Sequence, residues 1–282
     1  MALHALTTAD SEGTMITDSD TATFTSFDGL VLEGTVTTPT GTLNGRAILV
    51  HGMTADREEW GFFTQLSEHL RTLGIASLRF DYRCHGASSG IPATDLSLGG
   101  IINDVNAAYE HLLSHFPDPA LPTFIFAVSF SGGVTAAWAS ALTSKPAKLF
   151  LCAPVLDYLA DIDKTCGDWR QNLASQGFFD YSVLRLARPL VNDISIIDVT
   201  GALKSSTFPI VIIHGVEDRD VPIAQSRRVI SLTPLASLIE VPNADHGFVS
   251  PGDLDGTSPG TMANYGLVFA HIEQQCREVL RA

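Results

Sequence analysis

The feature that most constrains the fold is a regular alternation of short apolar runs with amphipathic stretches, which fills most of the 282-residue chain. Segments such as FFTQLSEHLRTLG and IINDVNAAYEHLLSHF carry apolar residues three or four positions apart, as helices with one buried face do. Strands that alternate with helices are joined by right-handed crossovers. The pattern therefore predicts an α/β fold, with a mostly parallel central sheet and helices on both of its faces. The runs typical of buried strands are AILVHG (47–52), IASLRFDY (75–82), TFIFAVS (123–129), AKLFLCAPV (147–155), PIVIIHG (209–215) and SLIEVPNAD (237–245).

Two segments do not follow this alternation of strands and helices. Near the N-terminus, TFTSFDGLVLEGTVTTP alternates polar and apolar residues around Asp28-Gly29, which predicts a β-hairpin. Later, roughly 50 residues separate two successive strands, and connections of that length are usually lids or functional insertions. We therefore expect three parts. Residues 1–20 form a loose leader, residues 21–155 together with 208–282 form the α/β core, and residues 156–207 form a cap or lid insertion.

The composition argues against several classes of function. Asp and Glu number 31 against 17 Lys and Arg, and no basic cluster occurs, so a nucleic-acid or anionic-membrane partner is not expected. The four cysteines show no C-x-x-C spacing for zinc binding or dithiol chemistry, which favours plain thiols in a reducing cytoplasm. No apolar run reaches the roughly 18 to 20 residues of a membrane span, and the first residues lack the pattern of a secretory signal. The sequence thus predicts a cytoplasmic protein.

The segment FIFAVSFSGGV (124–134) is the sharpest local signal for chemistry. A buried strand runs directly into a helix there, with Ser129 at the junction. A serine on such a tight turn projects its hydroxyl above the carboxyl edge of the sheet, as a nucleophile requires. Strand and helix approach closely at this turn, and the flanking Ala127 and Ser131 are small, although neither is the glycine of G-x-S-x-G. The alternative is that Ser129 or Ser131 only caps the helix.

A serine hydroxyl needs a base, and the base needs an acid partner that fixes its tautomer. The segment PIVIIHGVEDRDVPIAQS places Asp218 just beyond a strand end, with Glu217 and Asp220 as local rivals that could instead cap the following helix. His246 follows the last strand in LIEVPNADHGFVSP, and the adjacent Asp245 is expected to be structural. Ser, Asp and His thus occur in this order at the carboxyl ends of separate strands, where open α/β sheets bind their ligands.

A candidate oxyanion hole accompanies these side chains. The chain turns at His51-Gly52 after the strand AILV, so the N–H of Met53 could face the same site as the N–H of Phe130. Two such donors are what a tetrahedral acyl intermediate needs. The alternative is an ordinary strand-to-helix turn that uses glycine for its geometry.

The motifs HGMTADREEW, RFDYRCHGASSG, AVSFSGG, HGVEDRDVP and ADHGF resemble those of the α/β-hydrolase superfamily, over about residues 23–281. The first two look most like those of bacterial cinnamoyl (feruloyl) esterases. The A-x-S-x-S turn is similar to that of the acyltransferase/thioesterase of bacterial luminescence operons. The resemblance implies that Ser129 is the nucleophile, His246 the general base and Asp218 its orienting acid, with the Met53 and Phe130 amides as the oxyanion hole.

One position departs from the family pattern. Cys84 stands where these families usually have glycine in D-x-R-G-H-G-x-S. We expect its thiol to pack beneath the site and not to act as a second nucleophile. The family's cap usually emerges where this chain has its long insertion, but a cinnamoyl substrate does not follow, because the cap decides specificity.

The sequence therefore predicts a serine hydrolase of carboxylic esters, with thioesters as a further substrate class, that needs no metal and no organic cofactor. The expected partner is a small-molecule ester or thioester of a small acyl or aromatic acid, and a homodimer is possible. Two alternatives stay open: an acyltransferase or thioesterase that acts on carrier-bound acyl groups, and a non-catalytic binding protein with the hydrolase fold. The net charge of −14 favours a neutral ester over an acidic carrier protein.

Overall fold

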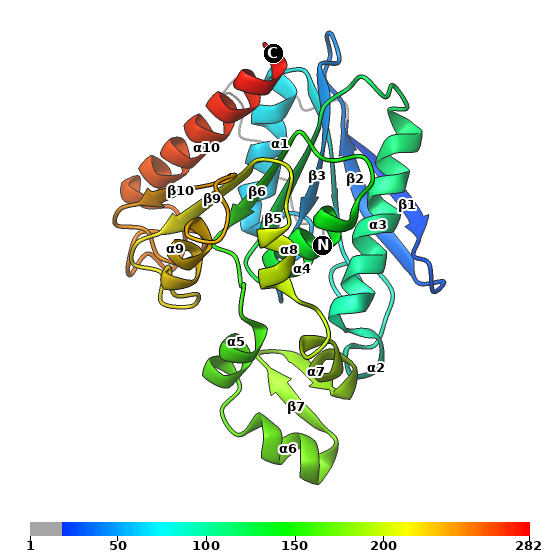
Figure 1. Ribbon diagram of the computed structural model, residues 1–282, viewed down its shortest axis with the longest axis vertical. Helices are drawn as coiled ribbons and strands as arrows, with labels where there is room; N and C mark the ends of the chain where they lie inside the picture. Colours follow the sequence, from blue (N-terminus) through cyan, green and yellow to red (C-terminus); the bar gives the residue numbers. More distant parts are fainter. Residues whose placement is uncertain (1–18) are drawn as a thin grey trace, which may run out of the picture.

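The computed structural model describes residues 19–282, and an eight-stranded sheet in the order β1-β2-β4-β3-β5-β6-β9-β10 forms its centre (Figure 1). The six strands from β4 to β10 in that order are mutually parallel, whereas β2 is antiparallel to both β1 and β4. The strands are β1 (Ser19–Thr25), β2 (Val31–Thr37), β3 (Gly45–Val50), β4 (Ile75–Phe80), β5 (Thr123–Val128), β6 (Lys148–Cys152), β9 (Ile210–Gly215) and β10 (Ala236–Val241).

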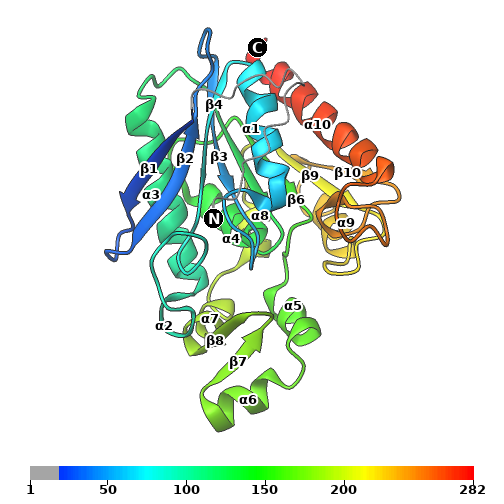
Figure 2. The same ribbon diagram turned by 180° about the vertical axis from the view of Figure 1, so that it is seen from behind.

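Helices cover both faces of this sheet, which explains the apolar runs (Figures 1 and 2). Every residue of the central strands β3, β4, β5, β6 and β9 is buried, because their side chains meet helices in both directions. One face packs on α1 (Phe62–Thr72) and α10 (Pro259–Leu280), and the other on α3 (Leu98–His115), α4 (Ser131–Ala141) and α9 (Ala224–Ile230). The α/β-hydrolase architecture expected from the sequence is confirmed.

The N-terminal hairpin is also confirmed, since β1 and β2 pair around the turn at Asp28-Gly29. Of the expected leader, residues 1–18 lie outside the described residues, and β1 begins at Ser19. Arg83, in the loop after β4, anchors this hairpin to the core. The buried Arg83 guanidinium makes paired hydrogen bonds to the Asp104 carboxylate on α3 and to the Asp28 carboxylate in the hairpin turn, at 2.7–3.0 Å.

The long connection between β6 and β9 forms a lobe beyond the carboxyl ends of the strands (Figures 1 and 2). It contains a two-stranded antiparallel hairpin of its own and four helices. The last of these helices, α8, packs on α4 of the core, and Ser140 on α4 donates to the Ala202 carbonyl at 3.0 Å. The elements are α5 (Tyr158–Thr165), α6 (Trp169–Gln176), β7 (Phe178–Tyr181), β8 (Leu184–Ala187), α7 (Arg188–Ile194) and α8 (Val199–Lys204).

Three short elements complete the chain: α2 (Pro92–Asp95) and the 3₁₀ turns η1 (Glu59–Gly61) and η2 (His246–Phe248). None of the helices within residues 19–282 combines the length and the apolar character needed to cross a membrane. All four cysteines are free thiols.

Candidate active site

Ser129 occupies a strained turn between β5 and α4. Its backbone φ is +52°, in the left-handed region that side chains other than glycine rarely adopt. Hydrogen bonds over-determine this conformation, because the Ser129 N–H donates to the Cys152 carbonyl at 2.9 Å and its carbonyl accepts the Val155 N–H at 2.8 Å. The start of α4 and the segment that follows β6 approach each other so closely that a Cβ at Gly132 would lie 2.4 Å from the Pro154 side chain. Strain at one residue, supported by its surroundings, is typical of a functional position.

Ser131, which replaces the usual glycine two residues later, is fully buried in this turn. Its hydroxyl lies 2.9 Å from the Val50 carbonyl at the end of β3 and 3.0 Å from the Val128 carbonyl. It also accepts the Val128 N–H at 3.2 Å. Ser131 therefore ties two neighbouring strand ends to the turn, which explains why a serine fits where glycine is common.

His246 and Asp218 complete a hydrogen-bonded chain with Ser129. The Nε2 atom of His246 lies 3.0 Å from Ser129 Oγ, and its Nδ1 lies 2.9 Å from Asp218 Oδ2. Burial lowers the pKa of His246, but the hydrogen bond and charge of Asp218, together with the charges of Asp220 and Glu59, outweigh it, so the net pKa is raised. The structure thus brings together the three side chains that the sequence singled out, in the geometry that a nucleophile, its base and an orienting acid require.

Asp218 is held by more than His246. Its Oδ1 accepts the N–H groups of Asp220 at 2.9 Å and Val221 at 2.8 Å, while its Oδ2 lies 3.2 Å from Nε2 of the buried His214. Burial alone raises the pKa of Asp218, yet the hydrogen bonds from His214 and His246 hold it well below its usual range. Asp218 is therefore ionised at every pH near neutrality. Sequence reasoning missed His214, whose only signal was a polar residue inside the apolar run PIVIIHG.

Glu217 and Asp220 are the other two candidates for the acid partner of His246, and neither takes that place. Asp220 donates its backbone N–H to Asp218, and no side-chain hydrogen bond joins Glu217 or Asp220 to His246 within residues 19–282. Asp245, expected to be structural, accepts the N–H of His246 at 2.8 Å and the Nε of Arg219 at 2.6 Å. It thereby fixes the loop that carries His246.

The two candidate oxyanion donors belong to chain segments that meet at Ser129. Phe130 follows Ser129 directly, and Gly52, next to Met53, is so close that a Cβ there would lie 3.2 Å from Ser129 Cβ. Neither the Met53 N–H nor the Phe130 N–H donates a hydrogen bond in the part of the chain that the structure describes. The Gly52 carbonyl accepts the hydroxyl of buried Tyr82 at 3.0 Å, which fixes the turn. Both amides are available to an anionic oxygen.

The lobe contributes a polar pair near these groups. Asp161 on α5 is 5% exposed and accepts the hydroxyl of Tyr181 on β7 at 2.9 Å. The Tyr181 ring meets the Phe130 ring edge-on at 5.8 Å. Burial raises the pKa of Asp161, and the charge of His246 acts against it, so the pair lies within electrostatic reach of the triad.

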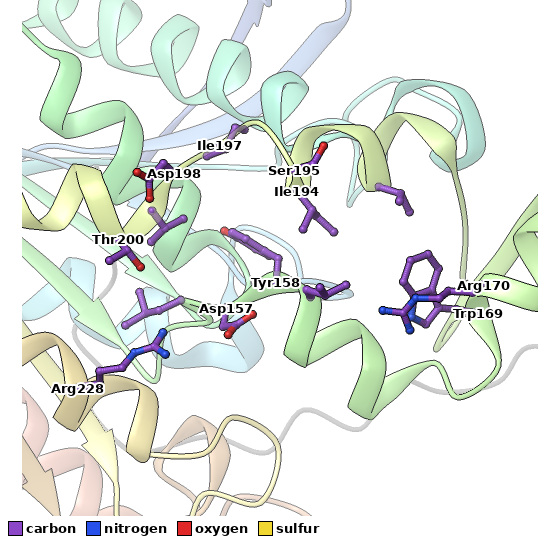
Figure 3. A pocket seen from close by; sticks show the side chains of 14 residues that line it. Asp157, Tyr158, Trp169, Arg170, Ile194, Ser195, Ile197, Asp198, Thr200 and Arg228 are labelled. Atoms are coloured by element: carbon purple, nitrogen blue, oxygen red, sulfur yellow. The ribbon is translucent and has the colours of Figure 1, made fainter.

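A separate cavity of about 530 Å³ lies between the lobe and α9 (Figure 3). Tyr158, Trp169 and Ile194 contribute apolar walls, and Arg228 lies at its edge. None of Ser129, Asp218 and His246 lines it. The Tyr158 hydroxyl nevertheless donates to the Phe130 carbonyl at 2.7 Å and accepts the Val134 N–H at 2.7 Å, so this side chain separates the cavity from the Ser129 turn.

Cys84 adopts a left-handed backbone conformation, which glycine adopts without strain. This explains why the related families usually have glycine at this position. Its φ is +67°, and a Cβ at Gly90 would lie 2.7 Å from its sulfur. Burial, and next the charge of Asp95, raise the pKa of the Cys84 thiol to about 12, so it is protonated at neutral pH. Elsewhere in residues 19–282, no group of three or more His, Cys, Asp or Glu side chains is arranged to hold a metal ion.

Comparisons with known proteins agree with this architecture. The family model described as serine aminopeptidase, S33, matches residues 42–198, more than half of the chain. Est1E from Butyrivibrio proteoclasticus is similar over 93% of this chain and 100% of its own, with a TM-score of 0.73 and 19% identity. The esterase domain of a Rhodothermus marinus protein is similar over 91% of this chain and 98% of its own, with a TM-score of 0.67 and 17% identity.

A curated relative matches a shorter stretch. Polyketide transferase ATR5 of Stachybotrys chlorohalonatus is 29% identical over 140 residues, which are 49% of this chain and 45% of that protein. The match therefore spans less than half of the relative. Together with the fold, the family match shows that this chain belongs to the serine aminopeptidase S33 family of α/β hydrolases.

Proposed function

We propose that the protein hydrolyses carboxylic esters of small acyl or aromatic acids through an acyl-enzyme formed on Ser129. The observation that carries this proposal is the continuous chain Ser129–His246–Asp218, with contacts of 3.0 and 2.9 Å, beside two unpaired amides. A non-catalytic binding protein has no need for a strained serine aligned with a base and a buried acid. The same machinery accepts thioesters.

The mechanism follows from these positions. His246 Nε2 takes the hydroxyl proton of Ser129 as Oγ attacks the ester carbonyl carbon, and Asp218 stabilises the imidazolium that forms. The N–H groups of Met53 and Phe130 donate to the oxyanion of the tetrahedral intermediate. His246 then protonates the leaving alcohol, which departs. Water attacks the acyl-enzyme with His246 again as the base, and the acid is released as Ser129 regains its proton.

The hydrogen-bonded pair Asp161 and Tyr181 favours one class of acyl group. Asp161 is buried and hydrogen-bonded to Tyr181, whose ring lies edge-on to the Phe130 ring. A buried polar pair of this kind favours a ligand that carries a hydroxyl group, because an all-apolar ligand leaves it without further partners. Ferulic acid, a hydroxylated aromatic acid, is bound in one solved structure of Est1E, which shares 21% identity with this chain. We therefore place hydroxylated aromatic esters first among the candidate substrates.

Acyl transfer is the second candidate function, and the similarity to a polyketide transferase favours it. Transfer uses the same acyl-enzyme but an alcohol or thiol in place of water. Turnover of an activated ester in the presence of increasing methanol or a thiol separates the two. A hydrolase releases mainly free acid, whereas a transferase releases mainly the new ester or thioester.

A substrate panel tests the proposed acyl specificity. We expect kcat/KM for a 4-coumaroyl ester to exceed that for the matched cinnamoyl ester, which differs only by lacking the hydroxyl. Tyr181→Phe should reduce this preference by about tenfold, chiefly through KM. Short p-nitrophenyl esters and acyl thioesters complete the panel, and Tyr109→Phe, on α3 of the core, is the matched control. Equal kcat/KM for both aromatic esters, unchanged by Tyr181→Phe, would remove the hydroxylated acyl group from the proposal.

A further inference from the structure

Glu59 is a carboxylate at the centre of the site that neither sequence reasoning nor the triad accounts for. It is the first residue of the 3₁₀ turn η1, between β3 and α1, and its Oε2 accepts the Gly52 N–H at 2.6 Å. Its φ is +44°, and the next two residues, Trp60 and Gly61, also have positive φ, at +56° and +89°. Two successive residues with side chains rarely adopt this conformation. The turn brings the Glu59 side chain back to the start of its own loop.

Gly52 connects this carboxylate to the reacting groups. A Cβ at Gly52 would lie 3.2 Å from Ser129 Cβ and 3.6 Å from Glu59 Oε1, so Ser129 and Glu59 both lie against the same glycine. The Met53 N–H, a proposed oxyanion donor, follows directly in the chain. A shift of the Gly52 peptide therefore turns the Met53 amide away from the oxyanion, and the bond from Glu59 opposes that shift.

The charge of Glu59 is compensated only weakly. It forms no ion pair with Lys or Arg within the described part of the chain; its neighbours Arg57 and Arg79 pair with Glu58 and Asp81. The one positive charge that faces it is that of His246 when protonated. The titratable groups around Glu59 are His246 on η2, Asp56 on the same loop, Tyr82 after β4, Cys152 on β6 and Tyr265 on α10.

These surroundings place the titration of Glu59 near neutrality. Burial raises the pKa of Glu59 to about 7, although the Gly52 N–H and the charge of His246 act to lower it. In the reverse direction, the charge of Glu59 contributes to the raised pKa of His246. The charge of each group therefore favours the charged form of the other.

We propose that Glu59 is a positioning residue of the oxyanion loop, whose ionised carboxylate holds the Gly52 N–H so that the Met53 amide stays directed at the reacting oxygen, and whose charge stabilises the His246 imidazolium. This role rests on the function proposed above. It adds to the Asp218 carboxylate a second one, which acts through Gly52 and His246 and touches no substrate. Protonation of Glu59 removes the charge and weakens the acceptor, so the enzyme loses activity as the pH falls through about 7.

The variant Glu59→Gln separates charge from shape, because its amide oxygen still accepts the Gly52 N–H. We expect kcat/KM about tenfold below wild type near pH 8.5, where Glu59 is ionised. The two curves should converge near pH 6, where wild-type Glu59 is protonated and where loss of the charge has lowered the pKa of His246. Glu59→Ala removes the acceptor as well, and we expect its kcat to lie about tenfold below that of Glu59→Gln at every pH, with little change in KM.

The neighbour Glu58→Gln is the matched control, since its carboxylate contacts Arg57, Thr64 and Arg79 and makes no hydrogen bond to Gly52 in the described part of the chain. Its ratio to wild type should not change with pH. A pH-independent ratio for Glu59→Gln, or a rate above wild type at pH 8.5, overturns the proposal; thermal unfolding of each variant separates loss of fold from loss of rate. Ser129→Ala distinguishes failure of the proposed function from failure of the proposed role of Glu59. If Ser129→Ala keeps its activity, the proposed function fails. If Ser129→Ala is inactive while Glu59→Gln equals wild type, only the role of Glu59 fails.

Discussion

Ser129→Ala should lower kcat for p-nitrophenyl butyrate by roughly 10⁴-fold or more, with little change in the midpoint of thermal unfolding. The large loss follows from the covalent step, because no other hydroxyl lies within hydrogen-bonding distance of His246 Nε2 among the described residues. Some rate above the uncatalysed reaction remains, since the Met53 and Phe130 amides still stabilise the oxyanion when water attacks directly. Steady-state kinetics and a thermal melt of the same preparation measure both quantities.

The unchanged stability has a physical reason. Ser129 is strained at φ +52°, and within residues 19–282 its hydroxyl forms a hydrogen bond only with His246, so its removal leaves the backbone bonds of the turn in place. The exposed Ser114→Ala at the end of α3 serves as the control and should match wild type in both measurements. Full activity of Ser129→Ala would exclude Ser129 as the nucleophile.

Asp218→Asn has the second largest expected effect, a loss in kcat of roughly 10²- to 10⁴-fold. The asparagine keeps the shape but removes the charge that stabilises the His246 imidazolium, and its amide group can face Nδ1 with N–H atoms and so favour the wrong tautomer. Asp220→Asn is the matched control, and we expect a change of less than about threefold, because its side chain makes no hydrogen bond to His246 among residues 19–282. A larger loss for Asp220→Asn than for Asp218→Asn would reverse the assignment.

The pH dependence gives an independent check on Asp218. Because the pKa of Asp218 lies well below its usual range, Asp218 stays ionised and does not shape the acidic limb of the wild-type profile. That limb reflects His246, whose pKa is raised mainly by Asp218 against the effect of burial, together with Glu59. Removal of the Asp218 charge lowers the pKa of His246, so the acidic limb of the residual Asp218→Asn activity should move to lower pH.

The sequence predicted the parts of the fold in which burial alone determines the pattern. The strands β3, β4, β5 and β9 are buried on both faces, so their apolar runs coincide with the observed strands to within a few residues. The run at 147–155 overshoots β6, which ends at Cys152. Ala153 and Val155 are apolar for another reason: they lie beneath the Ser129 turn, where Ala153 has φ +46° and the Val155 N–H binds the Ser129 carbonyl.

Other features depend on contacts between distant segments and leave no local pattern. The β7–β8 hairpin pairs two four-residue strands inside a stretch without clear periodicity. His214 and Glu59 acquire their roles from partners elsewhere in the fold, namely Asp218 and the Gly52 turn. Ser129, Asp218 and His246 were easier to predict, because each follows a recognisable strand and chain order limits the alternatives.

The acyl-enzyme is the most direct test of the central claim. The protein is mixed with a slowly deacylating p-nitrophenyl ester or a fluorophosphonate, quenched in acid, and analysed by intact mass and peptide mapping. We predict one adduct per chain, located on Ser129 in the segment FIFAVSFSGGV, formed in Ser114→Ala and absent in Ser129→Ala. Ester turnover with no adduct on Ser129, or an adduct that persists in Ser129→Ala, would contradict the account.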